Sequence, residues 1–263
     1  MGVPTALLLW AALLGVFAGL AAGLLGVGGG LVIVPVLAML FTAAGYDHVM
    51  HLAVGTSLAT IVFTSLSSVR AHHRHGAVLW PVFRRLTPGI VIGALAGAAI
   101  ADRLPGDRLR LVFGLFELWV AVQMSLDIRP APHRRLPGPV GMGLAGFVIG
   151  GVSAIVGIGG GTLTVPFLVW CNVAMRQAVA TSAACGLPIA IAGSLGFLVT
   201  GWDAPGRPPG SLGYLHLPAL GAIVVTSMLA APWGARLAHR LPARTLKRIF
   251  ALLLFALAAK MLA

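Results

Sequence analysis

Long apolar stretches separated by short polar gaps run along this whole chain. A helix that spans a bilayer needs about 20 predominantly apolar residues, and most of these stretches approach that length. Only 9% of the 263 residues are charged, against about 25% in a soluble domain. We therefore predict an all-α, polytopic membrane protein, with helical segments near residues 4–25, 29–44, 51–69, 81–100, 109–126, 140–156, 160–171, 177–200, 215–235 and 246–262.

The charge balance is strongly basic, with 18 Lys and Arg against 6 Asp and Glu and a formal net charge of +12. These basic residues lie in the short gaps, where Lys and Arg orient membrane helices and contact anionic lipid headgroups. We therefore expect the lipid bilayer, and no nucleic acid, as the partner. Cys171 and Cys185 match no zinc or redox spacing, so no metal and no cofactor are expected.

The two halves of the chain are related to each other. AVGTS at 53–57 recurs as AVATS at 178–182, and GAAIADRLP from Gly97 recurs as GARLAHRLP from Gly234. A glycine motif recurs with the same spacing, as Gly26, Gly28, Gly29, Gly30 and Pro35 in one half and Gly157, Gly159, Gly160, Gly161 and Pro166 in the other. Transporters are often built from such duplications. We predict a first transmembrane repeat at 1–128, a basic linker at 129–139 and a second transmembrane repeat at 140–263, with about five helical segments in each repeat.

The distribution of Lys and Arg bears on how the repeats are oriented. With five crossings per repeat, most of the 18 basic residues fall on one side of the membrane, as the positive-inside rule requires. This favours inverted repeats with both termini outside; parallel repeats are the alternative. The first apolar segment lacks the basic start of a signal peptide and aligns with an internal segment, so we expect a permanent membrane helix there.

Each glycine motif, GVGGG at 26–30 and GIGGG at 157–161, interrupts an apolar run and precedes a short apolar segment. In hydrocarbon, irregular backbone persists only where it is buried in protein or lines a cavity. The helix that starts after each motif presents free N–H groups, which bind anions well. Two such starts facing each other near the midplane predict an anion site. A glycine-packed helical hairpin without a ligand would explain the same pattern.

Hydroxyl pairs follow both motifs in the next apolar segment, Thr56 and Ser57 in the first repeat and Thr181 and Ser182 in the second. They could line the anion site or bond to their own preceding helical turn. Thr162 and Thr164 occur only in the second repeat and are weaker candidates.

Glu117 is the single glutamate of the chain and lies within an apolar segment. A carboxyl group inside a membrane is a functional hypothesis by default, so Glu117 is our candidate for proton coupling. A hydrogen-bonded packing residue is the alternative, and sodium is a second candidate coupling ion. We interpret the basic cluster at 70–75, which contains His72, His73 and His75, as a loop at the headgroups and not as a metal site.

The two stretches GLLGVGGGLVIVPVL and VSAIVGIGGGTLTVPFL, each followed by AV-x-TS, resemble the TauE/SafE sulfite exporter family. The resemblance covers nearly the whole chain. It implies an integral inner-membrane transporter of small sulfur-containing anions such as sulfite or an organosulfonate. The segment from Gly201 to Gly213 has no counterpart in the first repeat, so a strictly symmetric site is not expected.

Together these features predict a secondary transporter that moves a small sulfur oxyanion by alternating access. No ATPase motif and no catalytic constellation is present in the sequence, so we expect no enzyme activity. A passive anion channel and a membrane-embedded subunit without transport activity of its own are the alternatives. The oligomeric state, including a homo-oligomer, stays open.

Overall fold

The computed structural model describes residues 4–25, 29–126, 134–238 and 243–263, which form ten helices and one small two-stranded sheet. In the predicted first repeat these are α1 (Thr5–Leu25), α2 (Gly30–Ala43), α3 (Val49–Arg74), α4 (Trp80–Arg103) and α5 (Gly106–Ser125). In the second they are α6 (Pro139–Val156), α7 (Gly161–Trp170), α8 (Met175–Thr200), the strands β1 (Ser211–Leu212) and β2 (Leu215–His216), α9 (Leu217–Ala238) and α10 (Ala243–Leu262).

Four of the helices in the described ranges, α3, α4, α6 and α8, are long and apolar enough to cross a membrane. The helices α2 and α7 have only 14 and 10 residues, fewer than the roughly 20 that a crossing needs. Both follow a glycine motif and contain its proline, Pro35 or Pro166. The all-α polytopic architecture and the two short helices agree with the sequence-based prediction.

Two segments differ from expectation. The cluster at 70–75 is not a loop, because His72, His73 and Arg74 form the last turn of α3 and His75 is its C-cap. Basic side chains in a last turn are stabilised by the negative end of the helix dipole, which explains why the helix continues past the apolar run. The segment after Gly201 contains the short hairpin β1–β2, with Ser211 paired to His216.

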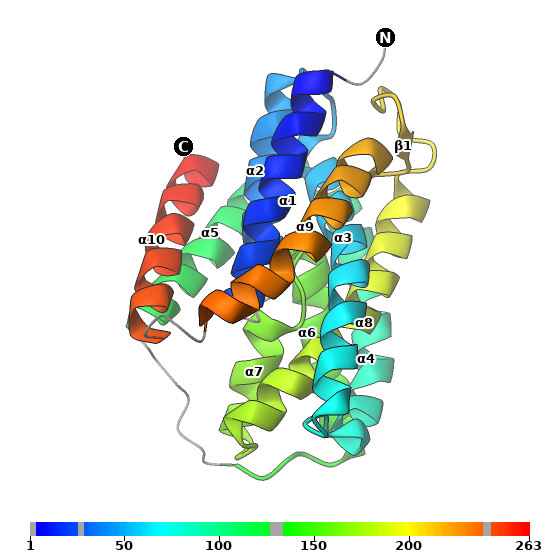
Figure 1. Cartoon of the computed structure of the whole chain (residues 1–263). Helices are drawn as coiled ribbons and strands as arrows, with labels where there is room; N and C mark the ends of the chain where they lie inside the picture. Colours follow the sequence, from blue (N-terminus) through cyan, green and yellow to red (C-terminus); the bar gives the residue numbers. More distant parts are fainter. Residues whose placement is uncertain (1–3, 26–28, 127–133, 239–242) are drawn as a thin grey trace.

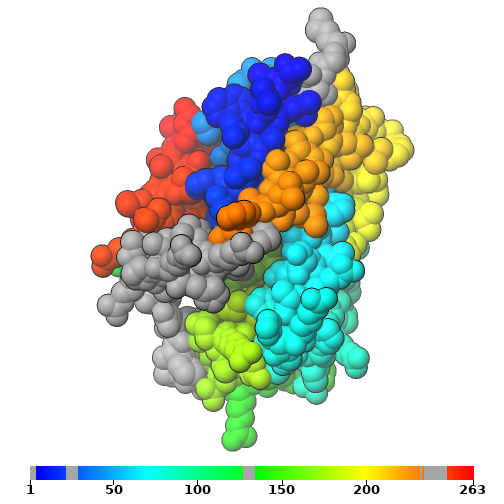
Figure 2. Space-filling view, viewed as in Figure 1, coloured from blue at the N-terminus to red at the C-terminus, as the bar shows by residue number. Residues whose placement is uncertain are grey.

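Helices from the two predicted repeats pack in exchanged pairs. The first helix of one repeat lies along the fourth helix of the other, so α1 packs against α9 and α6 packs against α4. Figure 1 shows α1 and α9 crossing side by side, and Figure 2 shows their side chains in contact on the same face. The third helices α3 and α8 also pack together and run in opposite directions, as do the chain colours along them in Figure 1. The fifth helices, α5 and α10, form a further pair.

Glycines make the exchanged pairs close. On α4, a Cβ atom at Gly93 would collide with the backbone oxygen of Phe147, and one at Gly97 with that of Gly151. On α1, Gly15 and Gly19 stand in the same way against the α9 backbone near Ile223 and Ser227. Small residues that allow backbones to approach are typical of helix contacts in membranes.

Candidate functional site

The second glycine motif ends one helix and starts another. Gly157 closes α6 in the left-handed conformation, with φ of 76°, which glycine adopts without strain. Its N–H group and that of Ile158 both donate to the Ser153 carbonyl, at 2.9 and 3.0 Å. The chain then turns, and α7 begins at Gly161 with Gly160 as its N-cap.

The first motif lies directly against the second. A Cβ atom at Gly30 would lie 2.6 Å from the Gly157 oxygen and 3.0 Å from the Ile158 Cα. Gly29 is the N-cap of α2, as Gly160 is of α7. Gly26 and Gly28 lie outside the described residues. The structure therefore brings the two glycine motifs together, although they are more than a hundred residues apart in the chain.

Backbone donors at the second motif have no acceptor within the part of the chain that the structure describes. This applies to the N–H groups of Gly159, Gly160 and Gly161, which precede or begin α7. All three glycines lie at the positive end of that helix. Gly159 and Gly160 are buried. Buried N–H groups are nearly always paired in native structures, so these two point to a missing acceptor.

Three hydroxyl groups near this motif also lack a partner. Ser153 and Thr164 are fully buried and Thr162 is nearly so, yet none of their oxygens is hydrogen-bonded within the described residues. Thr162 and Thr164 stand in the first turns of α7, and Ser153 stands one turn before Gly157 on α6. Ser153 is not among the predicted site residues, because Ala22 stands at the equivalent place in the first half and the hydroxyl therefore does not recur.

Thr56 and Thr181 join the repeats. The Thr56 Oγ1 accepts the backbone N–H of His216 at 3.0 Å, and the Thr181 Oγ1 accepts that of Leu79 at 3.0 Å. His216 directly precedes α9 and Leu79 directly precedes α4. Each threonine, on the third helix of its own repeat, thus supports the start of the fourth helix of the other repeat. We call this pair the exchanged threonine bonds.

The two serines bond differently from each other. Ser57 donates to the Gly157 oxygen at 2.8 Å and so fixes the turn of the second motif from the first repeat. Ser182 donates to the Val179 oxygen of its own helix at 2.8 Å. A Cβ atom at Gly160 would lie 2.7 Å from the Ser182 backbone oxygen, so α8 packs closely against the second motif. Both serines therefore border the glycine motifs, and each hydroxyl hydrogen is already donated to a backbone oxygen.

Glu117 lies apart from the motifs, on α5. Its side chain is fully buried, and neither carboxyl oxygen has a hydrogen-bond partner within the described residues. The helix α5 packs mainly against α10 and also touches α3 and α6. An ionised carboxylate would be costly in such surroundings, so the group is suited to hold a proton. Among the residues that the structure describes, no group of three potential ligands could hold a metal ion.

Comparison with known proteins identifies the family of this chain. The sequence model of the family described as "Sulfite exporter TauE/SafE" matches residues 11–261. The chain belongs to the TauE/SafE sulfite exporter family. The resemblance drawn from the two glycine motifs is thereby confirmed.

Proteins similar to this chain are named as probable membrane transporters. The chain is 38% identical to a probable membrane transporter protein of Haemophilus influenzae over 252 residues, which are 95% of this chain and 96% of the relative. It is 29% identical over 211 residues to the probable membrane transporter protein YunE of Bacillus subtilis, covering 72% and 77% of the two chains. A probable membrane transporter protein of Methanocaldococcus jannaschii is 24% identical over 242 residues, 89% and 88% of the chains. No solved structure matches this chain significantly.

Proposed function

We propose that this chain is a secondary transporter that moves small sulfur-containing anions, such as sulfite or an organosulfonate, across the inner membrane by alternating access. The observation that carries the proposal is the set of unpartnered donors at the second glycine motif. These are the N–H groups of Gly159, Gly160 and Gly161 together with the Thr162 and Thr164 hydroxyls. Family membership supports a sulfur anion as the substrate class.

The chemistry of these groups suits an oxyanion. Each can donate a hydrogen bond, and a sulfite or sulfonate group offers several acceptor oxygens. Because the donors are uncharged and the positive end of α7 adds only a partial charge, they would hold an anion without trapping it. A transporter needs this balance, since its substrate has to leave on the other side.

The conformation described is closed around this site. Gly157 to Gly160 are buried, and the side chains of Val34, Val54 and Ile61 lie against the motif. An anion reaches it only after a rearrangement. The exchanged threonine bonds are suitable points for that change, because the loop from α3 to α4 and the β1–β2 hairpin lie at opposite ends of the molecule (Figure 1). Breaking one bond at a time would open one end at a time.

Inverted repeats with both termini outside fit this scheme. The opposite directions of α3 and α8 and the exchanged helix pairs support the inversion. Glu117 is our candidate for the proton-coupling group, since it is buried, unpartnered and the single glutamate in the chain. Sodium coupling is tested by replacing the proton gradient with a sodium gradient.

The test is sulfite efflux from proteoliposomes that contain the purified protein. Thr164→Val keeps the volume of the side chain and removes a buried hydroxyl without a partner, so folding should be unaffected. We expect the efflux rate to fall about tenfold, because a hydrogen bond to a charged group is lost. Thr87→Val is the matched control, since the Thr87 hydroxyl bonds the Phe83 oxygen of its own helix. Equal rates in both variants would remove the second motif from the mechanism.

The same vesicles separate the alternatives. A transporter shows saturation and faster efflux when sulfite is present on the far side, whereas a passive channel shows neither. A membrane-embedded subunit without activity of its own would give no efflux above that of empty vesicles.

A further inference from the structure

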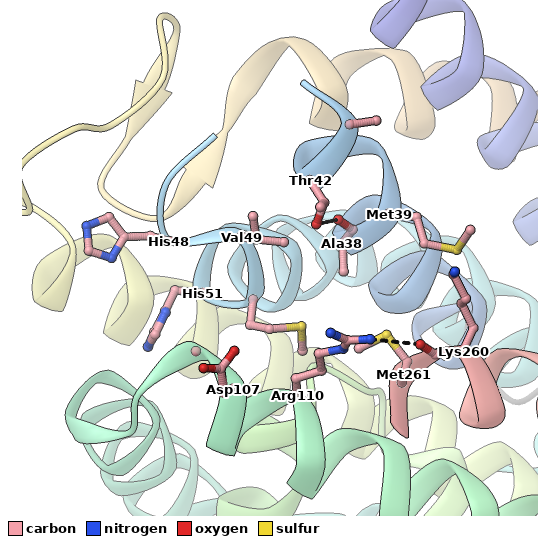
Figure 3. Close-up of a pocket in the computed structure, with 13 residues that line it drawn as sticks. Ala38, Met39, Thr42, His48, Val49, His51, Asp107, Arg110, Lys260 and Met261 are labelled. Carbon is pink, nitrogen blue, oxygen red and sulfur yellow. Dashed lines mark hydrogen bonds between the residues drawn. The ribbon is translucent and has the colours of Figure 1, made fainter. Parts of the chain in front are cut away.

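A second feature of the molecule is a half-open cavity of about 690 Å³ at one end of the bundle, and its lining contains no residue of either glycine motif. It lies between the end of α2, the start of α3, the start of α5 and the end of α10 (Figure 3). We call it the end pocket. Its polar lining comes chiefly from His48, His51, Asp107, Arg110 and Lys260, and most of the remaining wall is methionine, valine and alanine.

Two cations stand on one side of the end pocket. The Arg110 Nη2 donates to the Lys260 backbone oxygen at 2.9 Å, which ties α5 to the last turn of α10. This bond uses one of the five N–H donors of the guanidinium group. The Lys260 ammonium lies on the same side in Figure 3. Asp107 stands one turn before Arg110 on α5, and the described residues show no ion pair between the two. Both cations therefore have donors free for an anionic ligand.

Acceptors stand on the other side. His51 is 5% exposed, and its Nε2 lies 3.0 Å from the Ala101 oxygen. A carbonyl can only accept, so Nε2 carries the hydrogen and Nδ1 of the neutral ring is an acceptor. This Nδ1 is buried and has no partner within the described residues. The Asp107 carboxylate lies between His51 and Arg110 in Figure 3. The Asp107 carboxylate is exposed to the pocket and can accept from a ligand that carries a hydrogen-bond donor.

Helix dipoles do not decide what the end pocket binds. Two helices, α3 and α5, begin at the pocket and two, α2 and α10, end there. Their positive and negative ends largely cancel. The preference is therefore set by side chains, with cations on one side and acceptors on the other.

We propose that the end pocket binds a small zwitterionic group, whose oxyanion pairs with Arg110 and Lys260 and whose ammonium group, a few bonds away, pairs with Asp107. Two sources carry this chemistry: a short free aminosulfonate or aminophosphonate, and the phosphate and ammonium of a phosphatidylethanolamine headgroup. The proposal does not depend on the transport function.

The test measures binding of 2-aminoethanesulfonate to delipidated protein in detergent by isothermal titration calorimetry. Ethanesulfonate, which lacks the ammonium group, is the matched probe. We expect saturable binding of the zwitterion and binding of ethanesulfonate about tenfold weaker, as the loss of one charge-assisted hydrogen bond predicts. Equal affinity for the two probes would overturn the zwitterionic assignment.

Three substitutions place the ligand in the end pocket. Lys260→Gln should weaken both probes about tenfold, and Asp107→Asn should abolish the preference for the zwitterion. Lys260 uses only its backbone oxygen in the bond to Arg110, so the substitution leaves that bond in place. Arg108→Gln is the control, because Arg108 is an exposed cation on the same helix outside the pocket lining. Unchanged binding in Lys260→Gln would show that the ligand binds elsewhere.

Nanodiscs distinguish the two sources. If the lipid headgroup is the native occupant, phosphatidylethanolamine nanodiscs should suppress binding of 2-aminoethanesulfonate, and phosphatidylglycerol nanodiscs should not. If a free solute is the occupant, affinity should be the same in both. Either result supports the zwitterionic site and names its source. Thr164→Val, which alters the glycine-motif site, should leave this binding unchanged, so failure of one proposal is separable from failure of the other.

Discussion

The threonine hydroxyls near the glycine motifs fall into two groups, those with a hydrogen-bond partner and those without one. The sequence predicts Thr56 and Thr181 as pocket residues, and the structure adds that each accepts an N–H group, 160 and 102 positions away in the chain. No local pattern reveals such partners. Thr162 and Thr164, the weaker candidates by recurrence, are buried without partners. The recurring Thr56 and Thr181 therefore join the two predicted repeats, and the unpartnered Thr162 and Thr164 are better candidates for ligand contact.

Glu117 gives a prediction about coupling. Glu117→Gln keeps the size of the side chain but cannot exchange a proton, so we expect sulfite efflux to become independent of the pH gradient across the vesicle. Wild-type protein should respond to that gradient. Melting temperature serves as the control for folding, since amide and carboxylic acid are alike in volume. Full retention of the pH response in Glu117→Gln would assign coupling to another group.

His216 gives a prediction about stability. Its ring packs against Phe41 and Tyr46, and its Nδ1 accepts the Ala219 N–H at 3.2 Å, so the side chain caps α9. Burial lowers the pKa of His216 from 6.5 to about 4. Between these values the unfolded chain binds a proton that the folded chain does not, so this contribution to stability is present above pH 6.5 and is lost as pH falls toward 4.

His216→Asn tests this dependence. An asparagine oxygen can accept the same capping bond but does not titrate. We expect the drop in melting temperature between pH 7.5 and pH 5 to be smaller in the variant than in wild type. Carboxyl groups titrate alike in both proteins, so they cancel in the comparison. An equal drop in both would show that His216 does not control acid sensitivity.

The sequence predicts which helices form better than it predicts which helices pack against each other. Glycine motifs followed by short apolar runs predict α2 and α7, because 14 or 10 residues cannot span a bilayer as one helix. The spacing of Gly93 and Gly97 predicts a close helix contact, and the structure supplies the partner, α6. The hairpin β1–β2 has no apolar periodicity and is not predicted, since it is held by backbone contacts to α8 through Tyr214.

The α4–α6 contact gives a matched pair of substitutions. A Cβ at Gly93 would meet the Phe147 backbone oxygen, whereas a Cβ at Gly143 on α6 would meet open space. We expect Gly93→Ala to lower the free energy of unfolding by about 1–3 kcal/mol through overpacking. Gly143→Ala should instead raise it by up to about 1 kcal/mol, because alanine favours the helix. Unfolding in detergent with increasing denaturant measures both, and a stable Gly93→Ala protein would contradict the close packing.

Across the whole molecule, inversion makes a prediction about sidedness. The loop before α3 and the loop before α8 are equivalent in the two repeats and should lie on opposite sides of the membrane. After Cys171 and Cys185 are replaced by alanine, Asp47→Cys should react with an impermeant maleimide in intact spheroplasts, and Ala174→Cys only after permeabilisation. Both positions are exposed in the structure. Labelling of both from the same side would establish parallel repeats.

The exchanged pairing also has a consequence for biosynthesis. The helices α1 and α4 find their principal neighbours, α9 and α6, in the half of the chain that is translated later. The glycine faces of α1 and α4 thus enter the bilayer before the backbones that will cover them exist. The helices of the first half therefore stay without these neighbours in the membrane, in contact with lipid or an insertase, until the second half has been translated. The helix bundle can assemble only after that.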